Sequence, residues 1–74
     1  MTSKRLTAVI LKEDDWYVAH CVELAVVSQG RSIEEAQRNL KEAVELYVES
    51  FGADDVPSST GEIVLYPFDV ALSA

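Results

Sequence analysis

Few side chains in this sequence have the chemistry of a catalytic or metal site. His20 and Cys21 are the only histidine and the only cysteine, and they are neighbours in the chain. Adjacent side chains of a strand point to opposite faces, so this pair cannot act together as nucleophile and base. One histidine and one cysteine are also too few for a zinc site within one chain. We expect Cys21 to be a small buried residue and His20 to be hydrogen-bonded, with pH sensing or partner binding by His20 as the alternative.

Carboxylates are the other reactive groups. Metal-dependent nuclease chemistry needs several of them converging on two divalent cations. The acids to consider are Glu34, Glu35, Glu42, Glu45 and Glu49 in one segment, and Asp14, Asp15, Glu23 and Asp69 elsewhere. The first apolar run, residues 6–11, has none. The sequence therefore predicts a protein that is not an enzyme, with no metal site and no cofactor.

The chain is strongly acidic. Thirteen Asp and Glu residues against six Lys and Arg residues give a formal net charge of −7. Such a field repels phosphate backbones and attracts basic proteins, so we expect no direct binding of nucleic acid. Solubility alone is the other explanation of this charge.

No apolar run approaches the length of a membrane span, and the run at residues 6–11 is too short for a signal peptide. We therefore expect a cytoplasmic protein that does not enter the membrane. Its 74 residues allow one domain, 1–74, with a core that is marginal by itself. Since one cysteine cannot form an internal disulfide, we expect self-association into a homodimer or higher oligomer.

One long helix is predicted over residues 33–51. Its apolar residues recur at spacings of three and four: Ile33, Ala36, Leu40, Ala43, Val44, Tyr47, Val48 and Phe51. Ser32 is the expected N-cap, and Glu35 should accept from the Ser32 amide in a capping box. Gly30 suits the turn before the helix, and Gly52 suits its end.

Strands are predicted over residues 4–12, 16–22, 26–28 and 62–72, with a loop over residues 53–61. The first strand is apolar on both faces, which places it in the interior of the sheet. Pro67 either interrupts the last strand or confines it to an edge. The fold class is α+β, in the order β-β-β-α-β. It is a four-stranded, mostly antiparallel sheet with the helix on one face.

The segment containing these elements resembles the short HicB-like antitoxins of type II toxin–antitoxin systems. The matching elements are Tyr17-Val18-Ala19, Glu23-Leu24, Ser28-Gln29-Gly30, Ser32-x-x-Glu35-Ala36, Asn39-Leu40 and Glu42-Ala43. The similarity covers residues 6–50. Val22 stands where many members have proline, and Asp15 stands where glycine is common.

This resemblance implies a partial ribonuclease H-like fold and a role in blocking a small basic mRNA-cleaving toxin of the HicA type. Longer members carry a C-terminal DNA-binding domain. We expect none here, because the chain ends at Ala74 soon after the last predicted strand.

The leading hypothesis is that the protein is an antitoxin that covers the RNA-binding surface of the toxin. Asp14, Asp15 and Glu23 would supply the charge, and Trp16 would be the anchor. The alternatives are a stand-alone oligomeric structural or adaptor module without a toxin and, disfavoured by the acid-free first run, a degenerate ribonuclease H-like hydrolase.

Overall fold

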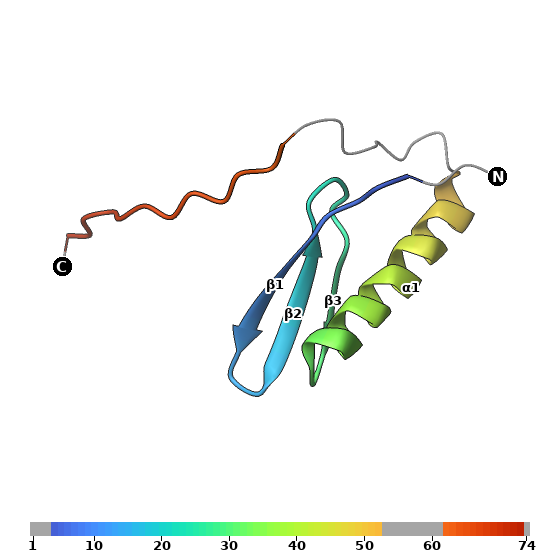
Figure 1. Ribbon diagram of the computed structural model, residues 1–74, viewed down its shortest axis with the longest axis horizontal. Helices are drawn as coiled ribbons and strands as arrows, with labels where there is room; N and C mark the ends of the chain where they lie inside the picture. The colour runs from blue at the N-terminus through green and yellow to red at the C-terminus, as the bar shows by residue number, and fades with distance from the viewer. Residues whose placement is uncertain (1–3, 53–61, 74) are drawn as a thin grey trace.

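The fold is a three-stranded antiparallel sheet crossed on one face by one long helix (Figure 1). The computed structural model describes residues 4–52 and 62–73. Its elements are β1 (Ala8–Glu13), β2 (Trp16–Cys21), β3 (Val27–Gly30) and α1 (Ile33–Phe51). The predicted α+β class is confirmed in this coarser form.

The strands form a meander. β1 pairs with β2 and β2 pairs with β3, both antiparallel, in the order β1-β2-β3. Asp14 and Asp15 make the tight turn between β1 and β2, and Asp14 has a positive φ of 55°. Aspartate tolerates this left-handed backbone better than most residues because its short polar side chain bonds locally. The predicted hairpin is therefore confirmed.

The position of β1 differs from expectation. Apolar residues on both faces predicted an interior strand, but among the described residues β1 is an edge strand and β2 is central. That prediction was wrong because apolar residues on both faces show that a strand is covered on its faces, not that another strand pairs with each of its edges. Leu11 is instead 50% exposed on the sheet face opposite the helix. We call this the open face.

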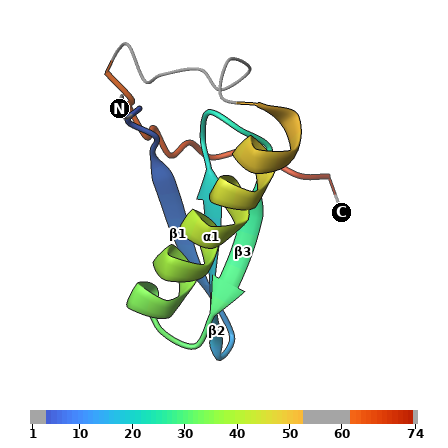
Figure 2. The ribbon, with the colours of Figure 1, turned by 90° about the vertical axis from the view of Figure 1, so that its right-hand side faces the viewer.

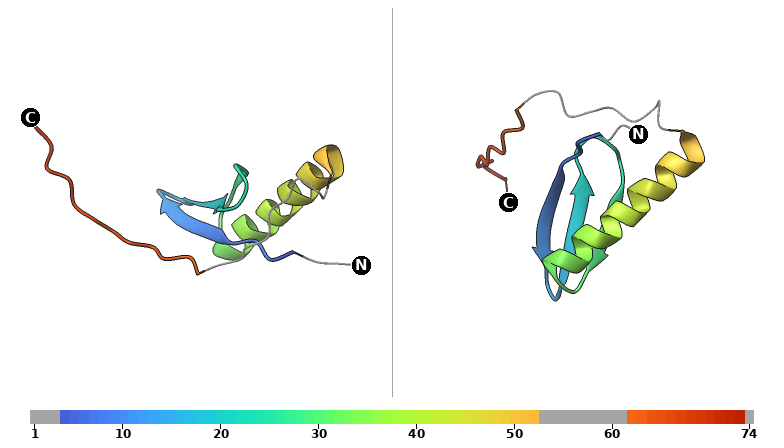
Figure 3. Two further views of the ribbon diagram at one scale, coloured as in Figure 1. Left: turned by 90° about the horizontal axis from the view of Figure 1, so that it is seen from above. Right: turned by 45° about the vertical axis from the view of Figure 1, so that its right-hand side comes forward.

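The fourth strand predicted over Glu62–Leu72 is not formed. Residues 62–73 contain no helix or strand, and they lead away from the sheet (Figures 1 and 3). Tyr66 and Phe68 are 80% and 77% exposed. The loop predicted over residues 53–61 lies outside the described residues.

Helix α1 spans the 19 residues that its apolar period predicted. The Glu35 amide donates to Ser32 Oγ at 3.0 Å, which confirms the N-cap. The reciprocal bond is displaced by one residue, because Glu35 Oε1 accepts from the Arg31 amide at 2.9 Å instead of the Ser32 amide. Gly52 follows with a φ of 92°, and its amide donates to Val48 O at 2.7 Å.

The core lies between α1 and the sheet (Figure 2). Its buried residues are Ala19, Cys21, Leu24, Ala36 and Leu40. Gly30 lets the helix come close to β3, because a Cβ there would lie 2.6 Å from Ala36 N. Among the core residues that the structure describes, only Ala19 and Ala36 are completely buried, so the core is thin, as expected for a chain of this length.

Candidate functional site

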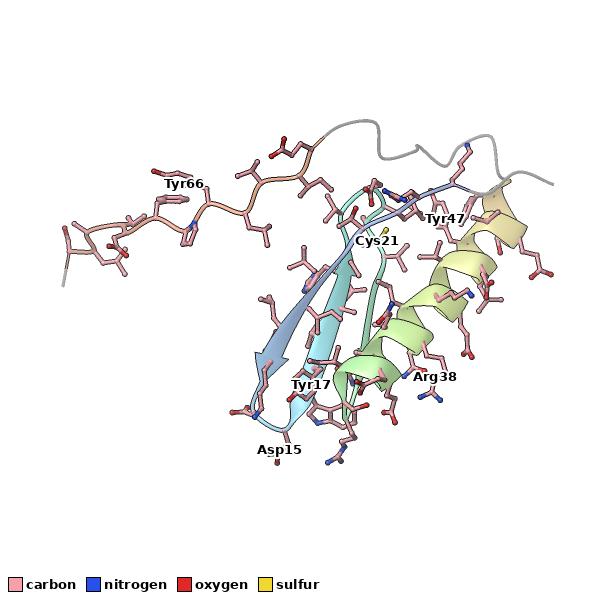
Figure 4. The ribbon with its side chains drawn as sticks, in the orientation of Figure 1. Asp15, Tyr17, Cys21, Arg38, Tyr47 and Tyr66 are labelled. Atoms are coloured by element: carbon pink, nitrogen blue, oxygen red, sulfur yellow. The ribbon has the colours of Figure 1, made fainter. Side chains whose placement is uncertain are left out.

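Three of the residues predicted to bind a partner gather at one end of the sheet. Asp14 and Asp15 form the β1–β2 turn and are exposed, and Trp16 begins β2 with 37% of its surface exposed. Figure 4 places Asp15 at the tip of this hairpin. We call Asp14, Asp15, Trp16 and Arg31 the hairpin-end surface. It combines two carboxylates with a large amphipathic ring, a combination that suits protein recognition.

Arg31 belongs to this surface although the sequence did not indicate it. Its guanidinium carbon lies 4.2 Å from the centroid of the Trp16 ring, a cation–π contact. The β2–β3 register pairs Tyr17 with Gly30, and this brings the next residue, Arg31, beside Trp16. The only available signal was an arginine three residues after the third predicted strand, residues 26–28, and this position gave no pairing register. The contact orients the indole at the end of the sheet.

Glu23 lies apart from this group. It sits in the connection between β2 and β3, at the opposite end of the sheet from the β1–β2 turn. Its Oε1 accepts from the Thr7 amide at 2.7 Å and lies 3.9 Å from Cys21 Sγ. This half-buried carboxylate therefore ties the chain leading into β1 to the β2–β3 connection. The four predicted residues do not form one surface.

His20 and Cys21 occupy opposite faces of β2, as the alternation predicted. Cys21 is 7% exposed in the core under α1, whereas His20 is half-buried on the open face. The open face also carries Leu11, Val22 and Val27, each between 48% and 54% exposed. Throughout residues 4–52 and 62–73, no three His, Cys, Asp or Glu side chains lie close enough to hold a metal ion together.

A groove of about 530 Å³ runs between α1 and the chain at the start of β1. Leu6, Ala8, Leu40 and Val44 contribute apolar lining. Its polar lining residues are Lys4, Thr7, Cys21, Glu34, Gln37, Arg38, Lys41 and Glu45. We call this the α1–β1 groove. It exists because α1 packs on β3 and β2 more than on β1, so the helix side of the edge strand is left partly uncovered (Figure 3).

These features define a small α+β protein made of an antiparallel three-stranded meander and one covering helix. In the part of the chain that the structure describes, no helix has the length and apolarity required to cross a membrane.

Comparison with known proteins assigns the family. The chain is 41% identical over 70 residues to a UPF0150 protein of Helicobacter pylori, covering 92% of this chain and 97% of that relative. It is 38% identical over 66 residues to a UPF0150 protein of Synechocystis, covering 86% and 84% of the two chains. The chain belongs to the UPF0150 family. No protein-family model matches the chain, and no solved structure matches it significantly.

Proposed function

We propose that this protein is a HicB-like antitoxin that binds and neutralises a small basic mRNA-cleaving toxin of the HicA type, and that it is not itself an enzyme. The observation that carries the proposal is the gathering of Asp14, Asp15 and Trp16 on the hairpin-end surface. The sequence resemblance over residues 6–50 supplies the class of partner. In this proposal the protein acts in the cytoplasm as a homo-oligomer with a partial ribonuclease H-like fold, in which residues 62–72 supply a fourth strand.

The physical basis is competition with RNA. A protein that cleaves mRNA must hold phosphates with Lys and Arg side chains. The exposed carboxylates of Asp14 and Asp15 offer those cations an alternative partner, and a net charge of −7 accelerates the encounter at low salt. Trp16 supplies apolar area at the centre of the contact, where exclusion of water strengthens the neighbouring charge pairs.

The test is to search the adjacent genes for one that encodes a small basic protein, and to produce that protein together with this chain. The two proteins should copurify, and the antitoxin should suppress RNA cleavage by its partner. Neutralising both turn residues, Asp14→Asn with Asp15→Asn, should weaken binding by roughly tenfold or more, mainly through slower association at low salt. Asparagine at position 14 preserves the turn because it also tolerates positive φ.

The matched control is Glu42→Gln with Glu49→Gln. It removes the same two charges from exposed positions of α1, away from the turn. The control should bind within about twofold of the unaltered protein, since a rim charge remote from the contact contributes little. If both double variants weakened binding equally, the effect would come from net charge alone. The hairpin-end surface would then not be the binding surface. If the two proteins formed no complex, the proposal that this protein binds a toxin would be wrong.

A stand-alone oligomeric structural or adaptor module is the second candidate. It is favoured by the exposed apolar side chains of the open face and of residues 62–72. This candidate predicts a stable oligomer and no complex with the neighbouring basic protein.

A degenerate hydrolase remains the third candidate. It predicts RNA cleavage that requires Mg²⁺ or Mn²⁺ and that is lost in Glu23→Gln.

A further inference from the structure

The outer edge of β1 presents backbone groups that no strand meets within the described residues. Thr7 O accepts from Val22 N at 2.9 Å, so Thr7 and every second residue after it direct their backbone groups toward β2. Ala8, Ile10 and Lys12 therefore direct their N–H and C=O groups away from β2. An edge of this kind is a template for an added strand.

The same edge borders the α1–β1 groove. Leu6 and Ala8 line its β1 side, and Leu40 and Val44 line its helix side. Ile10 packs against the core on the same face of the sheet. A strand added beside β1 would therefore form hydrogen bonds with the edge and bury one row of its side chains in the groove.

Residues 62–72 have the composition of such a strand. One row of its side chains is wholly apolar or aromatic and between 63% and 87% exposed: Val64, Tyr66, Phe68, Val70 and Leu72. The other row contains Ile63, Leu65, Pro67 and Ala71 together with the carboxylate of Asp69. Figure 4 shows Tyr66 on a segment that leads away from its own sheet and helix. A row of large exposed apolar side chains this long is unusual for a monomer and marks an interaction site.

Pro67 determines the direction in which this segment can pair. Proline has no N–H, so it must point away from β1, which leaves residues 64, 66, 68 and 70 to bond with the edge. In an antiparallel pair, residues that exchange hydrogen bonds carry their side chains on the same face. Their side chains then join those of Ala8 and Ile10 on the groove side. In a parallel pair, residues bonded to the edge would carry their side chains on the open face. The groove would then receive Ile63, Leu65, Pro67, Asp69 and Ala71, a row that has no aromatic ring and includes a carboxylate.

The antiparallel direction favours a second copy of the chain. α1 ends at the same end of the sheet at which β1 begins (Figure 1), so a segment entering the edge directly from its own helix would run parallel to β1. A segment from another copy has no such restriction. Reciprocal exchange between two copies would also close the assembly with two-fold symmetry and leave neither edge free.

We propose that residues 62–72 of a second copy pair antiparallel with the free edge of β1 and fill the α1–β1 groove, so that the protein is a strand-exchanged dimer. This inference rests on the self-association proposed above but not on the toxin. All its tests use the isolated protein, so failure of toxin binding leaves their outcome unaffected.

The direct test is nuclear magnetic resonance on an equal mixture of isotope-labelled and unlabelled full-length chains. Isotope-filtered spectra should show contacts between residues 8–12 of one chain and residues 64–70 of the other. The amides of Ala8, Ile10 and Lys12 should exchange with solvent at least roughly tenfold more slowly than in a monomeric variant. Contacts only within one chain, or no contacts between these segments, would overturn the proposal.

Mass measurement by sedimentation equilibrium provides a second test. The unaltered chain should have twice the 8.2 kDa of one copy. Val64→Lys with Val70→Lys places two charges in the groove and should weaken the dimer by roughly 100-fold or more. Circular dichroism should still show the α1 signal.

Two control variants test which face of the sheet and of the segment forms the dimer interface. Ile63→Lys with Ala71→Lys makes the same charge change on the opposite side of the segment and should leave the dimer intact. Val27→Lys alters the open face and should also leave it intact. A dimer that survives the groove variant but is lost in Val27→Lys would assign the interface to the open face and overturn the exchange.

Discussion

The guanidinium of Arg31 lies over the ring of Trp16, with 4.2 Å between the guanidinium carbon and the ring centroid. The pair connects the residue after β3 to the first residue of β2, so it stabilises the end of the sheet at which the proposed partner surface lies. Arg31→Ala should lower the free energy of unfolding by about 0.5–1 kcal/mol, as is usual for an exposed cation–π contact. Arg31→Lys should retain part of the stabilisation by the cation–π contact. Urea unfolding measures both, and equal stability of all three proteins would contradict the contact.

Gly30 is required for the close approach of β3 and α1. Gly30→Ala should destabilise the fold by about 1–3 kcal/mol, because the new Cβ would lie 2.6 Å from Ala36 N, a backbone atom that moves only with the first turn of the helix. Gln29→Ala is the control, since the Gln29 side chain is exposed on the same strand. It should change stability by less than about 0.5 kcal/mol. Thermal or urea unfolding would show the difference.

The N-cap at Ser32 should contribute measurably to α1. Ser32→Ala removes the oxygen that accepts from the Glu35 amide at 3.0 Å and should cost about 1 kcal/mol. Ser32→Asp keeps an acceptor and should remain near the unaltered stability. Ser50→Ala, near the other end of the helix, has no such role and should be close to neutral. A loss in Ser50→Ala equal to that in Ser32→Ala would argue against the cap.

Glu23 should act on stability, not on partner binding. Glu23→Ala leaves the Thr7 amide without the carboxylate that accepts from it at 2.7 Å, and should cost about 1–3 kcal/mol. Glu23→Gln keeps an acceptor oxygen and should cost less. Hydrogen exchange at the Thr7 amide should accelerate in both variants, and more in Glu23→Ala. If Glu23→Gln remained fully stable but lost binding to the basic partner, Glu23 would belong to the contact surface after all.

Local features were predictable because they depend on residues three or four apart. The α1 boundaries, the Ser32 cap and the hairpin turn at Asp14 and Asp15 follow from apolar period, capping chemistry and turn residues. The detail that failed was also local. Glu35 accepts from Arg31 and not from Ser32, and side-chain rotamers rather than sequence spacing decide between two adjacent amides.

Contacts between distant segments were not predictable to the same degree. The apolar residues of β1 suggested an interior strand, yet they suit an edge equally well when another surface covers that edge. Likewise, four acidic and aromatic residues suggested one partner surface, but the meander places Glu23 at the end of the sheet opposite Asp14, Asp15 and Trp16.

By itself, the sequence determined the α+β class, the extent of the helix and the hairpin, because these depend on hydrogen bonds and periodicity within short stretches of chain. Only the tertiary structure decided that β2 is central, that Arg31 meets Trp16, and that residues 62–73 lie away from the sheet of their own chain. Those outcomes depend on which distant backbone groups pair. Several pairings bury similar apolar area, so composition and spacing do not distinguish among them.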